Sequence, residues 1–183
     1  KGVIQRASAE VTIPGSKLKY VRATYQYQQY WPLSRTYTLF LNGEAGSESG
    51  FGGKQVPFWK NFYVGGIGSV RGFESGSLGP RDNSYGFDTY LGGTRRLVGN
   101  AELLFPMPGI GLDRSMRLSA FVDAGQVWGS GERITLSEIR ASAGFGVTWS
   151  SFMGPLKFSI AKPIKSKTDD KTQFFQFQMG TAF

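Results

Sequence analysis

The chain has 183 residues, a net charge of +8, 26 glycines and 15% aromatic residues. It contains no cysteine, which excludes a disulfide scaffold, a thiolate metal site and a cysteine nucleophile. It also lacks histidine, the commonest general base and metal ligand, so we expect no enzymatic activity, no metal site and no cofactor. The length suits one domain with a real core, and we treat residues 1–183 as a single domain.

The positive charge is scattered along the chain. Its densest stretch, four lysines between 162 and 171, is interrupted by Asp169 and Asp170. We interpret this stretch mainly as solvated loop charge, with contact to anionic lipid headgroups as the alternative. Without a basic cluster we expect no nucleic-acid partner.

No stretch approaches the length of about 18 apolar residues that a membrane-spanning helix needs. The chain begins at Lys1 in the middle of an alternating pattern, with no signal peptide, so we expect a fragment or a processed product.

Apolar and polar residues alternate with a period of two along most of the chain, which predicts β-strands. Proline and glycine mark turns between the alternating segments, as at Pro14-Gly15. Eight strands of about ten residues are predicted. In chain order they cover approximately 2–13, 20–30, 36–47, 100–105, 117–128, 140–149, 156–161 and 172–183.

Each predicted strand has one apolar and one polar face. The apolar residues that we expect to face lipid or detergent are Val21, Ala23, Leu118, Val122, Phe145, Val147, Phe158 and Phe177. The charged residues that we expect to face inward are Glu10, Glu44, Arg117 and Arg140.

This alternation is typical of a soluble antiparallel sheet as well as of a membrane barrel. The strand lengths are near the 9–11 residues that cross a bilayer at a tilt. Polar faces rich in glycine, serine and charge, and aromatic residues at strand ends, also favour an antiparallel transmembrane β-barrel. These aromatic residues are Tyr30, Trp31, Trp128, Trp149, Phe152 and Phe183. A soluble β-sandwich or lipocalin-like barrel is the alternative.

One connection, at about 49–92, is far longer than the other turns. Loops above about 15 residues without regular structure are uncommon and are usually functional or disordered. This one is too aromatic for disorder, so we expect it to pack against the rest of the chain. Its aromatic residues are Phe51, Phe58, Trp59, Phe62, Tyr63, Phe73, Tyr85 and Phe87. Its glycines miss the spacing of nucleotide-binding loops and are expected to serve tight turns.

Within this connection lies the sequence Val70, Arg71, Gly72 and Phe73. A charge held among apolar groups needs a partner. Glu102 and Asp123 lie on the polar faces of adjacent predicted strands, and the connection runs directly into the first of them. A connection folded back into the barrel lumen would place the Arg71 guanidinium between these carboxylates, with charge-assisted hydrogen bonds. Alternatively, each is a solvated charge without a fixed partner.

Several motifs resemble those of the BamA family of outer-membrane protein assembly factors. They are residues 52–58 (GGKQVPF), 61–66 (NFYVGG), 70–73 (VRGF), 78–80 (LGP), 121–128 (FVDAGQVW) and 154–159 (GPLKFS). The resemblance covers essentially the whole chain. It implies the C-terminal half of a 16-stranded barrel, strands nine to sixteen, in the bacterial outer membrane. It also implies that Arg71 pairs with Glu102 and Asp123, as the strand faces suggest.

The resemblance further implies outer-membrane lipid, client β-barrel proteins and accessory lipoproteins as partners of the parent protein. The last strand, 172–183, would form one edge of a weak lateral seam where clients are thought to insert. The residues of that strand assigned to the seam are Phe175, Phe177, Met179 and Phe183. The POTRA domains, which bind the lipoproteins in the family, and the first eight strands do not match any part of this chain, so the fragment alone should not assemble barrels.

Two other functions fit the same features. One is a two-partner secretion transporter pore of the same superfamily, which shares the loop arginine. The other is a small self-contained eight-stranded barrel that acts as a surface binder.

Closure of the barrel separates these alternatives. An eight-stranded barrel has an interior only wide enough for side chains, so the long connection would have no room inside it. We therefore expect the first strand, 2–13, and the last strand, 172–183, to pair with other strands and not with each other. The partners would be the missing half of the parent or a second copy, giving a homodimer of half barrels.

Overall fold

A computed structural model describes residues 1–13, 15–84, 88–109, 115–152 and 154–180 of the chain. Eight strands form one antiparallel sheet, in the order β1-β2-β3-β6-β7-β8-β9-β10, which confirms the predicted all-β antiparallel class. Their bounds are β1 Gly2–Val11, β2 Tyr20–Pro32, β3 Thr38–Gly50, β6 Arg95–Pro106, β7 Met116–Trp128, β8 Arg140–Ser151, β9 Gly154–Lys165 and β10 Phe175–Met179. No helix within the described ranges has the length and apolar character needed to cross a membrane.

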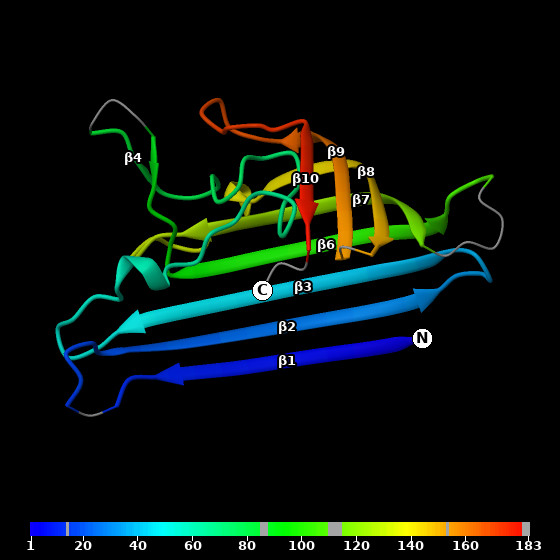
Figure 1. The fold of residues 1–183 in the computed structure, drawn as a ribbon. Helices are drawn as coiled ribbons and strands as arrows, with labels where there is room; N and C mark the ends of the chain where they lie inside the picture. The colour runs from blue at the N-terminus through cyan, green and yellow to red at the C-terminus, as the bar shows by residue number, and fades with distance from the viewer. Residues whose placement is uncertain (14, 85–87, 110–114, 153, 181–183) are drawn as a thin grey trace.

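The sheet curls from β1 to β10, and the connection between β3 and β6 lies within the curl (Figure 1). We call the face that carries this connection the inner face, and the opposite face the outer face. β1 pairs with β2, and β10 pairs with β9. Within the described part of the chain the two end strands do not pair with each other, as predicted. What covers the two edges stays a prediction.

The register of the strands divides the residues between the two faces as the alternation predicted. Asn100 lies opposite Asp123, and Asp123 lies opposite Ser142, so these polar residues share the inner face. The outer face exposes Val122 at 49% and Phe145 at 61% of their surface. The other apolar residues predicted for the outer face also lie on it, as the pairing of neighbouring strands shows. They are Val21, Ala23, Leu118, Val147, Phe158 and Phe177. The outer face is therefore mostly apolar, with Gln29 and Lys162 on the same register row as Val122.

Two of the aromatic residues predicted for strand-end girdles lie elsewhere. Tyr30 packs against Phe40, with ring centroids 4.7 Å apart, and both line the inner hollow. Trp128 is only 3% exposed, because the long connection covers that end of β7 and brings Pro80 to line the same pocket. Trp31, Trp149 and Phe152 are exposed. Phe183 lies outside the described residues.

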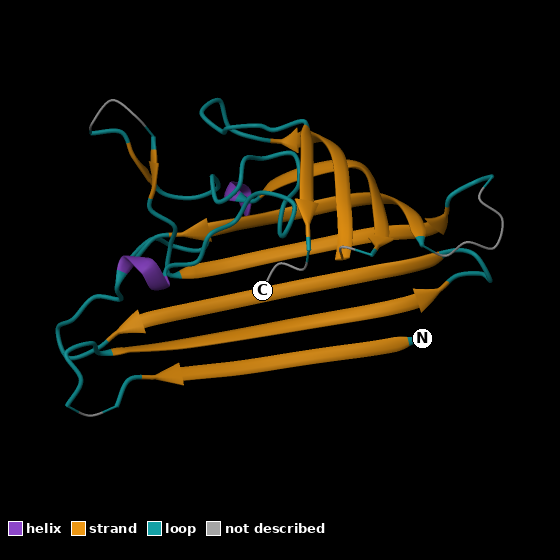
Figure 2. Ribbon diagram, in the orientation of Figure 1, coloured by secondary structure: helices purple, strands orange, loops and turns teal. Residues whose placement is uncertain are grey.

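The long connection spans 51–94, close to the predicted 49–92, and contains three short elements (Figure 2). They are the 3₁₀ helix η1 (Phe58–Lys60) and the paired strands β4 (Arg81–Asp82) and β5 (Thr89–Tyr90). A second 3₁₀ helix, η2 (Leu136–Glu138), precedes β8.

The buried hydrophobic cluster of the chain lies between the long connection and the sheet. It consists of Phe62, Val64, Val70, Phe73, Leu78, Val98 and Val127. Five of these residues come from the connection and two from β6 and β7. The expectation that the aromatic residues of the connection pack against the rest of the chain is wrong for Phe51, Phe58, Trp59 and Tyr63, which are exposed. Tyr85 and Phe87 lie outside the described residues.

Candidate functional site

The motif at 70–73 is seated deep in the concavity of the sheet. Val70 and Phe73 are fully buried. Gly72 has a φ of +86°, which favours glycine, and a Cβ atom there would lie 3.1 Å from the Cβ of Ala161 and 3.4 Å from the Cβ of Ser142. Only glycine therefore lets the backbone approach β8 and β9 this closely without strain.

Arg71 contacts both of the carboxylates that the strand faces predicted. Its Nε donates to Oδ2 of Asp123 at 2.7 Å and its Nη2 to Oδ1 of Asp123 at 2.9 Å, a bidentate pair. Nη2 also donates to Oε2 of Glu102 at 3.3 Å. The guanidinium carbon lies 3.3 Å from the ring centroid of Phe121, a cation–π contact. The structure thus brings Arg71, Asp123 and Glu102 together on the inner face.

The Asp123 carboxylate is fully buried and receives four hydrogen bonds. Besides the two from the Arg71 side chain, the Arg71 amide donates to Oδ2 at 3.1 Å, and Nδ2 of Asn100 donates to Oδ1 at 2.8 Å. An ionised carboxylate offers about four lone-pair sites, so its accepting capacity is used up. Asn100 also donates to the carbonyl of Ser69, and the Ser142 hydroxyl donates to the carbonyl of Arg71. This arrangement suits a structural clamp on the loop rather than proton transfer.

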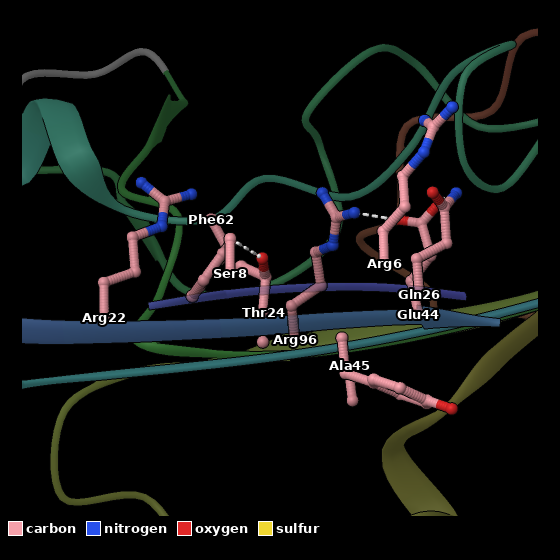
Figure 3. Close-up of a pocket in the computed structure, with 11 residues that line it drawn as sticks. Arg6, Ser8, Arg22, Thr24, Gln26, Glu44, Ala45, Phe62 and Arg96 are labelled. Atoms are coloured by element: carbon pink, nitrogen blue, oxygen red, sulfur yellow. Dashed lines mark hydrogen bonds and ion pairs between the residues drawn. The ribbon is translucent and has the colours of Figure 1, made fainter. Parts of the chain in front are cut away.

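A second anchor holds Phe62 of the long connection against β2, β3 and β6 (Figure 3). The guanidinium carbon of Arg22 lies 4.2 Å from the Phe62 ring centroid, and that of Arg96 lies 5.8 Å from it. Arg96 also pairs with Glu44. A Cβ atom on Gly46 would lie 2.7 Å from the Phe62 ring, so the ring rests directly on the backbone of β3. A pocket of about 320 Å³ opens beside it.

A third anchor joins the long connection and the loop after β9 to the first residue of β8. Oδ2 of Asp170 accepts from Nε of Arg140 at 3.0 Å and from the Lys167 amide at 2.7 Å. Oδ1 accepts from Nη2 of Arg140 at 3.1 Å and from Nη2 of Arg81 at 3.4 Å. The four lysines of this stretch are exposed, as expected for solvated loop charge, whereas the Asp170 side chain is buried. Arg81 ties the long connection into this cluster.

The environment of Asp170 makes this anchor sensitive to acid. Burial alone raises the pKa of the Asp170 carboxyl, but the hydrogen bonds from Arg140 and from the Lys167 amide outweigh burial, so its pKa lies below the ordinary value of 3.8. A carboxyl whose pKa is depressed in the folded state stabilises that state above its unfolded pKa and loses this contribution as pH falls through the folded pKa.

We therefore expect Asp170→Asn to lower the thermal unfolding midpoint of the complete protein at pH 6. The difference from wild type should shrink as the pH falls below 3.8 and through the depressed folded-state pKa of Asp170, where the carboxyl becomes protonated and resembles asparagine. Thermal unfolding at several pH values checks this, with Asp169→Asn as the matched neighbouring control. A difference that stays constant down to strongly acidic pH would contradict it.

The seam residues predicted on the last strand lie apart from the Arg71 cluster. Phe175, Phe177 and Met179 are more than half exposed on the outer face of β10, while Phe183 lies outside the described residues. β10 is also shorter than the predicted strand, because Thr172 forms a bridge with Phe73 of the long connection instead of with β9.

Sequence analysis did not predict Asn100, Phe121 and Ser142 as site residues, and it also missed Gln176 and Asp170. Gln176 of β10 contacts the motif at 70–73, and Asp170 accepts hydrogen bonds from Arg81 and Arg140. Alternation places Gln176 on the inner face, but no sequence signal connects it to a loop about a hundred residues earlier. In the described ranges no group of three acidic residues is arranged to hold a metal ion.

Comparisons with known proteins match the whole of this chain. The sequence model of the Omp85 superfamily domain matches residues 1–183. The outer membrane protein assembly factor BamA of Neisseria meningitidis serogroup B is 45% identical over 209 residues, which cover 100% of this chain and 26% of that protein. A SAM50-like protein of Schizosaccharomyces pombe is 30% identical over 159 residues, 82% of this chain and 32% of that protein.

The fold is also similar to that of a solved relative. The crystal structure of BamA from Haemophilus ducreyi lacking POTRA domains 1–3 superimposes with a TM-score of 0.86 and 34% sequence identity, covering 96% of this chain and 37% of that chain. The chain thus spans about a quarter to a third of the length of these relatives.

Proposed function

Because the chain belongs to the Omp85 superfamily, we propose that it forms the C-terminal part of the transmembrane barrel of an outer-membrane protein assembly factor of the BamA type. The observation that carries this proposal is the buried Arg71–Asp123 pair, which clamps a long connection to the inner wall in a chain 45% identical to a BamA along its whole length. The apolar outer face would contact outer-membrane lipid.

In this proposal the chain contributes two parts to the complete barrel. The first is the long connection held by Arg71, Asp123 and Glu102, which we call the latch loop. The second is the free edge of β10, which would form one side of a seam. No chemical step is required, so we propose no enzymatic activity. Client β-barrel proteins and accessory lipoproteins would be partners of the complete protein.

The free edge offers a physical route to client insertion. β10 presents unpaired backbone groups along one side, and such an edge can pair with an incoming strand. In hydrocarbon an unpaired backbone group costs several kcal/mol, so pairing with a client strand is strongly favoured there.

The unpaired edges disfavour a self-contained eight-stranded barrel. Two copies could satisfy the edges as a homodimer of half barrels, but the relatives are much longer than this chain, so we favour pairing with the rest of a longer protein. A two-partner secretion pore is less well supported, because the relatives described above are an assembly factor and a SAM50-like protein.

A reconstitution experiment tests the proposed function. The complete protein in liposomes should accelerate insertion of a small client barrel, measured as the heat-modifiable folded band on a gel. A photo-crosslinking residue at Met179 on the edge strand should capture the client during insertion, while one at Ala45 in the middle of the sheet should not. Insertion no faster than in empty liposomes, or equal capture at both positions, would overturn the proposal.

A further inference from the structure

The chain changes pairing partner just before β10. From Phe175 to Met179 it pairs with β9, and the carbonyl of Phe174 accepts from the Ala161 amide at 2.9 Å. One residue earlier the partner is the latch loop, because the Gln173 amide donates to the carbonyl of Gly72 at 3.0 Å. The upstream end of the last strand is thus bonded to the latch loop and not to the sheet.

This pairing with the latch loop extends over several residues. The Glu74 amide donates to the carbonyl of Lys171 at 2.9 Å, and Phe73 and Thr172 form an antiparallel bridge. The loop residues involved directly follow Arg71. Whatever holds Arg71 in place therefore also sets where the pairing of the last strand begins.

One side chain ties the two segments together. Gln176 is 5% exposed, and its Nε2 donates to the carbonyl of Phe73 at 2.7 Å. Its Oε1 accepts from the Gly72 amide at 3.4 Å, a weaker contact. The amide of Gln176 thus contacts two consecutive residues of the motif. A buried amide that loses such partners is left unsatisfied, which is unfavourable in free energy. This penalty opposes separation of the loop from β10.

We propose that Gln176 is a positioning residue that couples the latch loop to the seam strand. With the loop seated, Gln176 and the backbone at 171–174 are satisfied and β10 starts at a fixed position. Release of the loop removes these bonds together and frees the upstream part of the strand next to the seam. This role rests on the proposed function for its biological meaning, but the coupling is a property of the folded protein alone.

Hydrogen–deuterium exchange on the folded complete protein in lipid nanodiscs tests the coupling. Gln176→Leu removes both loop contacts and the 3.4 Å bond from Nε2 to Oε1 of Gln173, and Gln176→Glu keeps the acceptor but loses the donor to Phe73. Gln178→Leu is the matched control, since Gln178 follows on the same face of β10 and lines the open hollow. We expect Gln176→Leu to raise exchange roughly tenfold at 72–74 and at 172–176, with a smaller rise for Gln176→Glu and none for Gln178→Leu.

The decisive variant is Arg71→Ala, because the Arg71 side chain bonds to Glu102 on β6 and to Asp123 on β7 rather than to β10. If the coupling holds, Arg71→Ala raises exchange at 172–176 as well as at 70–74. Faster exchange at 70–74 with unchanged exchange at 172–176, or a Gln176→Leu profile identical to wild type, would overturn it. Exchange needs no client, so this result is independent of whether the wild-type protein inserts clients in liposomes.

Discussion

Arg71→Ala should destabilise the seated latch loop by about 3–5 kcal/mol, the cost of leaving a buried charge without its partner. Asp123 is fully buried and would lose two of its four hydrogen bonds, because the amide of residue 71 and the Asn100 side chain remain, while Glu102 is 15% exposed and can be partly hydrated. Water entering from the open hollow would move the effect toward the lower end of this range. The measurement is the protease sensitivity and hydrogen exchange of residues 70–74 in the folded complete protein.

Two further variants serve as controls for this effect. Arg71→Lys keeps the positive charge but cannot make the bidentate pair, so it should recover only part of the loss. Arg117→Ala removes an exposed arginine from β7, and its effect should stay within about 0.5 kcal/mol. The strand pairing of β2 and β3 should be unchanged in all variants. Equal effects at Arg71 and Arg117 would mean that the buried pair does not hold the loop.

Val122→Arg should destabilise the membrane-inserted protein by about 2–4 kcal/mol, because it places a charge in hydrocarbon near the middle of a spanning strand. Val122 is 49% exposed on the outer face and is the central residue of β7. The measurement is the folding equilibrium of the complete protein into liposomes.

Met116→Arg is the matched control. Met116 begins β7 and, six residues before Val122, shares its face, but it lies at the end of the strand, where the cost of a charge falls to about 0–1 kcal/mol. A large difference between the two variants would support an outer face that contacts the membrane, with Val122 deeper in the hydrocarbon than Met116. Equal effects would indicate that the outer face does not contact hydrocarbon.

Most of the fold prediction followed from the alternation of apolar and polar residues with a period of two. It assigned Glu102 and Asp123 to one face and Val122 to the other, because a pleated strand leaves no other choice once its direction is set. The Arg71 partners followed from the same parity, and the resemblance to the BamA family led to the same pair.

Parity assigns a strand residue to one face of the sheet. It does not predict what covers the end of a strand or which residues a loop contacts. Trp128 has the parity of an outward residue but is buried by the long connection. Asp170 and Gln176 were missed for the same reason. Their partners Arg81, Arg140 and Phe73 lie far away in the sequence, and only the three-dimensional path of the long connection brings them together.

We propose that the Arg71–Asp123 pair acts as one unit in an assembly factor. A double-mutant cycle on the client insertion rate tests this most directly. The complete protein is compared in liposomes as wild type, Arg71→Ala, Asp123→Ala and the double variant, each normalised to its folded fraction. If the pair is the unit that matters, both single variants slow insertion and the double variant is no slower than the worse single one. Strictly additive losses, or wild-type rates in both single variants, would contradict the account.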